Sequence, residues 1–266
     1  MAVSIFFNAY HTFSAAVLLE HVSQDDAVYI HLYKHYYISW NLDNHKKQEA
    51  QKMILINFKT YEQSTGNNAV ALAKQCEEAA VEAGKKAIVV PQTVDIFRVK
   101  QACTLPIYAQ HADEIDFGSH TGHMLIQGLK QAGAEGTIIN HSENRISMEK
   151  IGMIIEKCKE RDFKVLVCAQ DPEEVGEISK LAPDYVAYEP PELIGGDISV
   201  SSAKPELITE SVEKAGDIPL IVGAGVKNTE DVEIGKKLGA EGILVASGVV
   251  KAENPKEAVL QLMKGM

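Results

Sequence analysis

The chain has 266 residues, of which 45% are hydrophobic, so it is long enough for one large domain with a sizeable core. Its formal net charge of −11 argues against nucleic acid or an anionic membrane surface as the main partner. No apolar run reaches the roughly 18 residues that a membrane-spanning helix needs, so we expect no membrane segment and a cytoplasmic protein.

The cysteines form no C-x-x-C pair and show no metal-ligand spacing. We therefore expect free, buried thiols in a reducing compartment and no metal site. The four are Cys76, Cys103, Cys158 and Cys168.

Residues 1–52 differ in composition from the rest of the chain. They hold nine of the 17 aromatic residues and five of the nine histidines, and they contain no arginine, glycine or proline. The short apolar run 15–19 has no basic region before it, so neither a secretory signal nor a mitochondrial presequence is indicated. His31 and His35 are spaced i, i+4 but have no acidic or cysteine partners, so metal binding is not predicted there.

The polar run 41–52 is typical of a linker, and everything that a barrel domain needs follows it. We therefore expect two parts, an N-terminal extension (1–52) and a catalytic domain (53–266). The extension is expected to be dispensable, either as a flexible appendage or as the product of a mis-assigned start, with Met53 as the natural one. The alternative is a functional extension that packs its aromatic residues against the outer helices.

From Met53 onward the chain alternates between apolar, β-branched runs and segments with helical periodicity. Helical spacing of apolar residues is clear in 69–83 and 232–238. Strands that alternate with helices pair in parallel, and eight such units favour a closed (β/α)8 barrel, a TIM barrel in the α/β class. An open doubly wound sheet is the alternative, but no G-x-G-x-x-G follows the first strand. The eight predicted strands are 53–56, 87–90, 106–109, 137–139, 163–167, 185–188, 220–222 and 243–245.

Two helices carry a strong start signal. Asp171-Pro172-Glu173-Glu174 and Asn254-Pro255-Lys256-Glu257 each combine an N-cap residue, a proline at the first helical position and a glutamate at the third. Glycines are expected at helix C-termini, at positions 84, 133, 216 and 239.

In such barrels the reacting groups lie on the loops that follow the strands. Asn57 and Lys59 follow the first predicted strand, His141 and Glu143 follow the fourth, and Glu189 follows the sixth. The strands at the end of the chain are followed by two glycine-rich turns that can direct backbone N–H groups at an anion, as the loops after strands 7 and 8 often do. These turns are Gly223-Ala224-Gly225 and Ala246-Ser247-Gly248.

The stretch after Glu189 has the composition of a moving lid. Pro190 and Pro191 stiffen the chain, and Gly195 and Gly196 free it again. A carboxylate that loses water when a lid closes becomes a stronger base. The sequence thus places a glutamate base, a histidine, a lysine and two anion-binding turns at one mouth of the barrel. This combination predicts proton transfer on a small phosphorylated carbonyl compound.

These motifs, in this order, resemble the triosephosphate isomerase family over residues 53–266. The resemblance extends to the compact archaeal variety. The motifs are Asn57-Phe58-Lys59, His141-Ser142-Glu143, Tyr188-Glu189-Pro190-Pro191-Glu192-Leu193-Ile194-Gly195, Gly118-Ser119-His120-Thr121-Gly122-His123 and the stretch 242–248.

The resemblance implies a role for each residue. Glu189 would remove a proton from the carbon next to the carbonyl, and His141 would polarise the carbonyl oxygen as a neutral imidazole. Lys59 would stabilise negative charge on the enediolate and the phosphate. Asn57 would order the first loop and donate to substrate oxygens, and Glu143 would support the site by pairing with the lysine. Phosphate would be held by Gly195, Gly225 and the backbone of Ala246 and Ser247.

The same resemblance implies interconversion of glyceraldehyde 3-phosphate and dihydroxyacetone phosphate in glycolysis and gluconeogenesis. It implies no metal, no redox cofactor, no nucleic-acid partner, and a homotetramer, with a dimer as the alternative. His111, His120 and His123 would lie in the loop after strand 3, at a subunit contact, and Cys168 would be a packed thiol.

Two other functions stay open at this point. A phosphoribosyl isomerase barrel uses different acid–base residues, and a non-catalytic barrel has no need of the lysine, histidine and glutamate. Two positions depart from longer members of the family. Glu192 stands where they have tryptophan in the lid, and Gly225 where they have serine.

Overall fold

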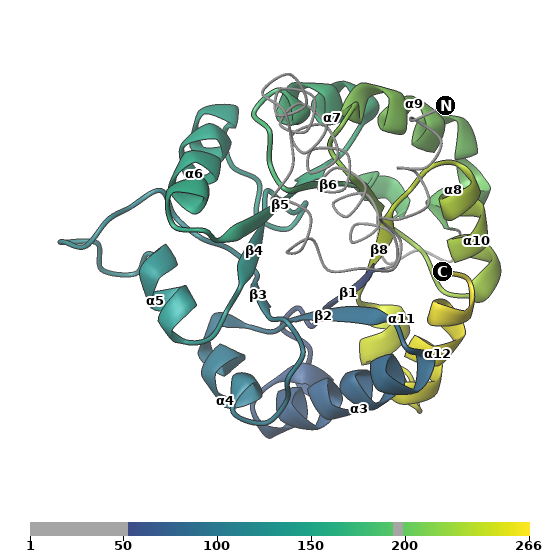
Figure 1. The fold of residues 1–266 in the computed structure, drawn as a ribbon, viewed down its shortest axis with the longest axis horizontal. Helices are drawn as coiled ribbons and strands as arrows, with labels where there is room; N and C mark the ends of the chain where they lie inside the picture. The colour runs from purple at the N-terminus through teal and green to yellow at the C-terminus, as the bar shows by residue number, and fades with distance from the viewer. Residues whose placement is uncertain (1–52, 194–198) are drawn as a thin grey trace, which may run out of the picture. The chain divides into compact units, whose positions relative to one another are not determined.

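The computed structural model describes residues 53–193 and 199–266. The described chain is a sheet of eight parallel strands surrounded by helices, as predicted (Figure 1). The predicted extension 1–52 and the lid glycine Gly195 lie outside the described residues, so the two alternatives for the extension stay predictions. The strands are β1 (Met53–Asn57), β2 (Lys86–Val90), β3 (Tyr108–Ala109), β4 (Gly136–Ile139), β5 (Lys164–Ala169), β6 (Tyr185–Tyr188), β7 (Leu220–Val222) and β8 (Gly242–Val245).

Helices follow the strands around the ring. The α-helices are α3 (Asn67–Ala83), α4 (Ile96–Lys100), α5 (Ile126–Gln131), α6 (Met148–Glu160), α7 (Pro172–Ser179), α8 (Val200–Ala203), α9 (Pro205–Ala215), α10 (Thr229–Lys237), α11 (Ser247–Val250) and α12 (Pro255–Lys264). Within the described residues there are also three short 3-10 helices, η1 (Glu62–Ser64), η2 (Thr93–Asp95) and η3 (Pro191–Leu193). No helix in these ranges is long and apolar enough to span a membrane.

The strand order β2-β1-β8-β7-β6-β5-β4-β3 brings the first and last strands of the chain together, with Met53 opposite Gly242. The remaining junction, between β2 and β3, is made by a single parallel bridge from Val89 to Ile107. This closure confirms the barrel and excludes the open doubly wound sheet.

The junction is short because β3 is short. The predicted strand 106–109 shrinks to Tyr108–Ala109, since Pro106 has no N–H to donate to a ladder. The Pro106 carbonyl still accepts a hydrogen bond from the Val89 N–H at 3.1 Å.

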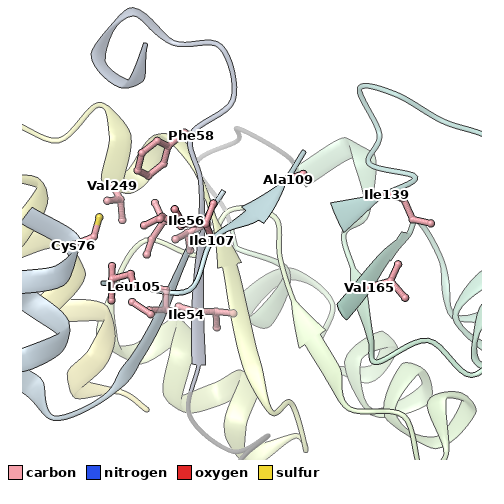
Figure 2. Packing of buried hydrophobic residues seen from close by; sticks show 14 of the residues in the cluster. Ile54, Ile56, Phe58, Cys76, Leu105, Ile107, Ala109, Ile139, Val165 and Val249 are labelled. Carbon is pink, nitrogen blue, oxygen red and sulfur yellow. The ribbon is translucent and has the colours of Figure 1, made fainter. Parts of the chain in front are cut away.

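Alternation along each strand divides the core into two layers. In β1, Met53 and Leu55 point into the barrel, whereas Ile54 and Ile56 point outward against the helices. Figure 2 shows the outer layer, in which Ile54, Ile56 and Phe58 lie on the side of the sheet that carries Cys76 of α3. All four cysteines are free and buried, as predicted.

The predicted helix starts are confirmed. The Asp171 carboxylate accepts a hydrogen bond from the Glu174 N–H at 2.8 Å, and Asn254 accepts one from the Glu257 N–H at 3.2 Å. Gly84 ends α3 in the left-handed conformation, with φ 60°, which a residue without a side chain adopts at little cost. Local sequence therefore fixes where several of the helices begin and end, which in turn fixes the loops at the mouth of the barrel.

Candidate active site

The ends of three strands bring the predicted residues to one cavity at the mouth of the barrel. Asn57 closes β1, His141 follows β4 and Glu189 follows β6, and their exposed fractions are only 4%, 6% and 7%. The cavity is lined by Asn57, Lys59, Tyr61, His141, Glu189, Ala224, Gly225, Val226, Lys227, Leu244, Val245, Ala246, Ser247 and Gly248. Among the predicted site residues, Glu143 does not line this cavity but forms an ion pair with Lys59, which does. Gly195 lies outside the described residues.

The Glu189 carboxyl group sits against the turn after β7. A Cβ atom at Gly223 would come within 2.5 Å of Glu189 Oε1, so only glycine leaves room for the carboxyl group in this position. The Glu189 N–H donates to the Ala169 carbonyl at 2.9 Å, which continues the ladder between β5 and β6. The side chain is thus fixed at its backbone end and confined at its carboxyl end.

Burial raises the pKa of Glu189 above its ordinary value, while His141 and a hydrogen bond from the Cys168 thiol act in the opposite direction. Glu189 Oε2 has no hydrogen-bond donor among the described residues. Its neighbour His141 Nε2 lies 3.8 Å away, too far for a hydrogen bond. A poorly solvated carboxylate of this kind is a stronger base than a solvent-exposed one.

Ionisation of Glu189 therefore costs folding stability. Because the pKa is higher in the folded chain than in the unfolded one, the folded state loses stability as pH rises from the unfolded pKa to the folded pKa. We expect Glu189→Gln to raise the free energy of unfolding by ~1–3 kcal/mol at pH 8. The gain should shrink below about pH 4, where Glu is also protonated in the unfolded chain.

Urea denaturation of the two proteins at pH 4 and pH 8 measures this difference. The matched control is Glu156→Gln on α6, which makes the same change at an exposed position and should alter stability at neither pH. If Glu189→Gln is no more stable than the unsubstituted protein at pH 8, Glu189 is not a poorly solvated carboxylate.

Hydrogen bonding sets the tautomer of His141. The backbone N–H of Glu143 donates to His141 Nδ1 at 3.2 Å, so Nδ1 carries a lone pair rather than a proton. A neutral ring must then carry its proton on Nε2, the nitrogen that faces the cavity and Glu189. The imidazole can therefore donate a hydrogen bond to a ligand without being charged.

Lys59 enters the cavity from a backbone conformation that is rare for a residue with a side chain. Its φ is 49°, and its N–H donates to Asn57 Oδ1 at 3.0 Å. The ammonium group lies 2.6 Å from Glu143 Oε1, and the lysine side chain is 11% exposed whereas that of Glu143 is 59% exposed. A carboxylate that remains largely exposed to solvent therefore orients the lysine side chain.

The two glycine-rich turns also line the cavity. Ala224 and Gly225 have φ values of 69° and 71°, and two successive left-handed residues turn the backbone sharply. Gly225 lines the cavity together with Ala246 and Ser247 of the second turn.

Three residues with polar side chains that contact or line this region were not among the predicted site residues. Tyr61 and Lys227 line the cavity, and the Gln110 amide bonds to the backbone of Lys59. Gln110 directly follows the third predicted strand, so its position was a signal that could have found it. Lys227 lies four residues beyond the Gly223 turn, and only the folded loop shows that it reaches the cavity.

Cys168 is a packed thiol, as predicted. It lies near the end of β5 and is 2% exposed, and burial raises the pKa of its thiol well above the ordinary range. A thiol of high pKa is a poor nucleophile. Among the described residues, no group of three or more His, Cys, Asp or Glu side chains is arranged to hold a metal ion.

The fold and site define a (β/α)8-barrel enzyme with a buried carboxylate, a neutral imidazole and a lysine at the carboxyl ends of its strands. Comparison with known proteins identifies the family. The family model described as triosephosphate isomerase matches residues 52–266, and the chain belongs to this family.

Curated relatives carry the same family name. The chain is 44% identical to triosephosphate isomerase of Methanothermus fervidus over 218 residues, which cover 80% of this chain and 98% of the relative. It is 44% identical to that of Methanocaldococcus jannaschii over 216 residues, with 80% and 99% covered. It is 42% identical to that of Methanosarcina mazei over 215 residues, with 79% and 97% covered.

Proposed function

We propose that the chain interconverts glyceraldehyde 3-phosphate and dihydroxyacetone phosphate through an enediolate. The observation that carries this proposal is the pairing of Glu189 and His141, buried side chains 3.8 Å apart at the cavity, one a strong carboxylate base and the other a neutral donor. Interconversion of an aldose and a ketose needs a base on carbon and a donor on oxygen, placed around a planar enediolate.

In this mechanism Glu189 removes a proton from the carbon next to the carbonyl. His141 Nε2–H donates to the carbonyl oxygen, which becomes the enediolate oxygen. The hydroxyl proton on the neighbouring oxygen passes to the former carbonyl oxygen, with His141 Nε2 within reach of both oxygens, and Glu189 returns its proton to the former carbonyl carbon. A carbonyl then stands on the carbon that lost its proton, which completes the exchange of aldehyde and ketone. Strands β4 and β6 deliver the two groups to the same cavity, so both can reach one bound substrate.

Lys59 supplies positive charge next to His141 and Glu189 in the cavity. Its ammonium stabilises the enediolate oxygens and the substrate phosphate, and Glu143 holds the ammonium from the solvent side. Asn57 orders the loop and donates to substrate oxygens. The backbone of Gly225, Ala246 and Ser247 binds the phosphate, and Gly195 does so from the lid.

A coupled assay tests the function against its two rivals. The purified chain should convert each triose phosphate into the other, and it should leave a phosphoribosyl aldose unchanged. Turnover of the phosphoribosyl compound alone would favour the second kind of isomerase, and turnover of neither would favour a non-catalytic barrel.

We further propose that the enzyme works in the cytoplasm, in glycolysis and gluconeogenesis, as an archaeal-type homotetramer. The relatives from Methanothermus fervidus and Methanocaldococcus jannaschii support the archaeal type. The loop between β3 and α5 supports self-association, because it projects beyond the ring of helices (Figure 1). Phe117 of this loop is 73% exposed.

A hollow of about 540 Å³ beside the active site could receive this loop from a second copy. It is lined by Lys59, Gln110, His111 and His123 among others. The His111 and His123 rings both lie near the Asp113 carboxylate, at 3.3 and 3.4 Å. His111 and His123 of this loop border the hollow, which is where a subunit contact is proposed.

We expect light scattering to give a mass of about four times the 29.1-kDa chain at micromolar concentration. Phe117→Asp should shift the protein toward smaller species, because it places a charge where an apolar contact is proposed. Val81→Asp on α3 alters a side chain that is equally exposed, at 76%, and should leave the mass unchanged. A monomer in the unsubstituted protein would contradict self-association, and a dimer would contradict the tetramer.

A further inference from the structure

The rare backbone conformation of Lys59 requires an explanation. A φ of 49° is uncommon for any residue except glycine, and residues stay in such conformations only where their surroundings hold them there. Such strain is concentrated at functional sites, where it fixes the direction of a side chain. Here the side chain carries the ammonium group that enters the cavity.

Two amide side chains hold the backbone of Lys59 from both ends. Asn57 Oδ1 accepts a hydrogen bond from the Lys59 N–H at 3.0 Å, and Gln110 Nε2 donates one to the Lys59 carbonyl at 3.0 Å. The two amides also approach each other, with Gln110 Nε2 3.4 Å from Asn57 Oδ1. The N–H and the C=O of the strained residue are therefore both used.

The same Gln110 nitrogen reaches a third strand. It donates to the carbonyl of Val90, the last residue of β2, at 3.1 Å. Backbone carbonyls only accept hydrogen bonds, so the atom that faces Lys59 and Val90 must be the amide nitrogen and not the oxygen. One side chain thus ties together the ends of β1, β2 and β3.

This tie lies where the barrel is joined most sparsely. Between β2 and β3 the sheet has one isolated bridge, from Val89 to Ile107, instead of a ladder. Few backbone bonds at this junction fix the loop after β1 relative to the loop after β3, so the Gln110 amide supplies a link that the sheet does not.

We propose that Gln110 is a positioning residue for the reaction, acting through Lys59. It holds the Lys59 backbone in its left-handed conformation, and thereby directs the ammonium group at the substrate anion. The inference rests on the proposed isomerase function and adds to it a residue that does not itself contact the substrate.

The test is a double-substitution cycle in the full chain. Gln110→Met keeps the length of the side chain and removes the donor, and we expect kcat/KM for both triose phosphates to fall about ten- to hundredfold, as displacement of a reacting group by about an ångström does. The second substitution is Lys59→Met, which removes the ammonium. If Gln110 acts through Lys59, adding Gln110→Met to Lys59→Met should lower kcat/KM less than threefold further.

A structural role elsewhere gives a different result. Losses that multiply in the double variant, or wild-type kcat/KM in Gln110→Met, would overturn the proposal. Gln101→Met, the same exchange at an exposed position after α4, is the matched control and should retain wild-type activity. If the unsubstituted protein does not interconvert the triose phosphates, the proposed function is wrong, and this result is distinct from failure of the Gln110 proposal, which is judged only from the substituted proteins.

Gln110→Asn covers the case in which Gln110→Met does not fold. It retains an amide but withdraws the donor by roughly one bond length, so it should show the same non-additivity with a smaller single loss. Circular dichroism monitors folding of each variant. Failure of both variants to fold would overturn the proposal too, because the amide would then be needed for the barrel and not for the lysine.

Discussion

Glu189→Asp should retain substrate binding and lose about two to three orders of magnitude in kcat, because proton transfer is sensitive to displacements of about an ångström. The shorter side chain withdraws the carboxylate by roughly one bond length. Gly223 packs directly against this carboxyl group, and the Glu189 N–H is fixed by the Ala169 carbonyl. Neither the turn nor the strand can therefore move to compensate.

Steady-state kinetics with each triose phosphate measure this effect. KM should change less than kcat, because the phosphate-binding groups are untouched. Glu156→Asp on α6 makes the same exchange at an exposed site and should behave as the unsubstituted protein does. Unchanged turnover in Glu189→Asp would remove Glu189 from the role of base.

Lys59→Met should severely weaken affinity for the dianionic substrate and for a phosphorylated enediolate analogue. The lysine side chain is 11% exposed, so its charge acts in a poorly solvated cavity. Removal of such a group from developing negative charge costs ~3 kcal/mol or more, which corresponds to a hundredfold or greater loss of affinity. Methionine preserves most of the length of the side chain, so the loss reports the charge.

The inhibition constant of the analogue is the direct readout. Lys237→Met, at the exposed end of α10, removes the same charge far from the cavity and should leave that constant unaltered. An unchanged inhibition constant in Lys59→Met would exclude the lysine from binding the anion.

Sequence periodicity was sufficient to predict most strands of the barrel. The strands 185–188 and 220–222 were predicted with their observed bounds, since each is a short apolar run bounded by turn residues. The predicted strand 106–109 differs most from the structure, because Pro106 has no N–H to donate to a ladder and β3 begins only at Tyr108. The predicted run 163–167 begins one residue later and ends two residues later in β5, because the chain continues in the strand through Cys168 and Ala169.

The candidate site was predictable at the level of position but not of contact. Strand ends indicated that Lys59, His141 and Glu189 share a mouth, because all strands of a parallel barrel point the same way. The approach of Gly223 to Glu189 depends on how the turn after β7 folds against β6, which no local pattern encodes. The same holds for Gln110, whose amide reaches the backbone of a residue 51 positions earlier in the chain.

The tautomer of His141 could not be predicted from the sequence either. It depends on a single backbone N–H, that of Glu143, and on its direction within the loop after β4. The motif His141-Ser142-Glu143 shows which residues follow the strand, but only the folded loop shows that Nδ1 is the acceptor.

The most direct test of the account is isomerisation in D2O, followed by nuclear magnetic resonance with each triose phosphate. Proton abstraction by Glu189 produces an enediolate whose removed proton can exchange with solvent before it is returned. We expect turnover accompanied by incorporation of one solvent deuteron at the carbon that receives the proton, and loss of both in Glu189→Gln. Rapid turnover in Glu189→Gln, or absence of turnover in the unsubstituted protein, would contradict the account.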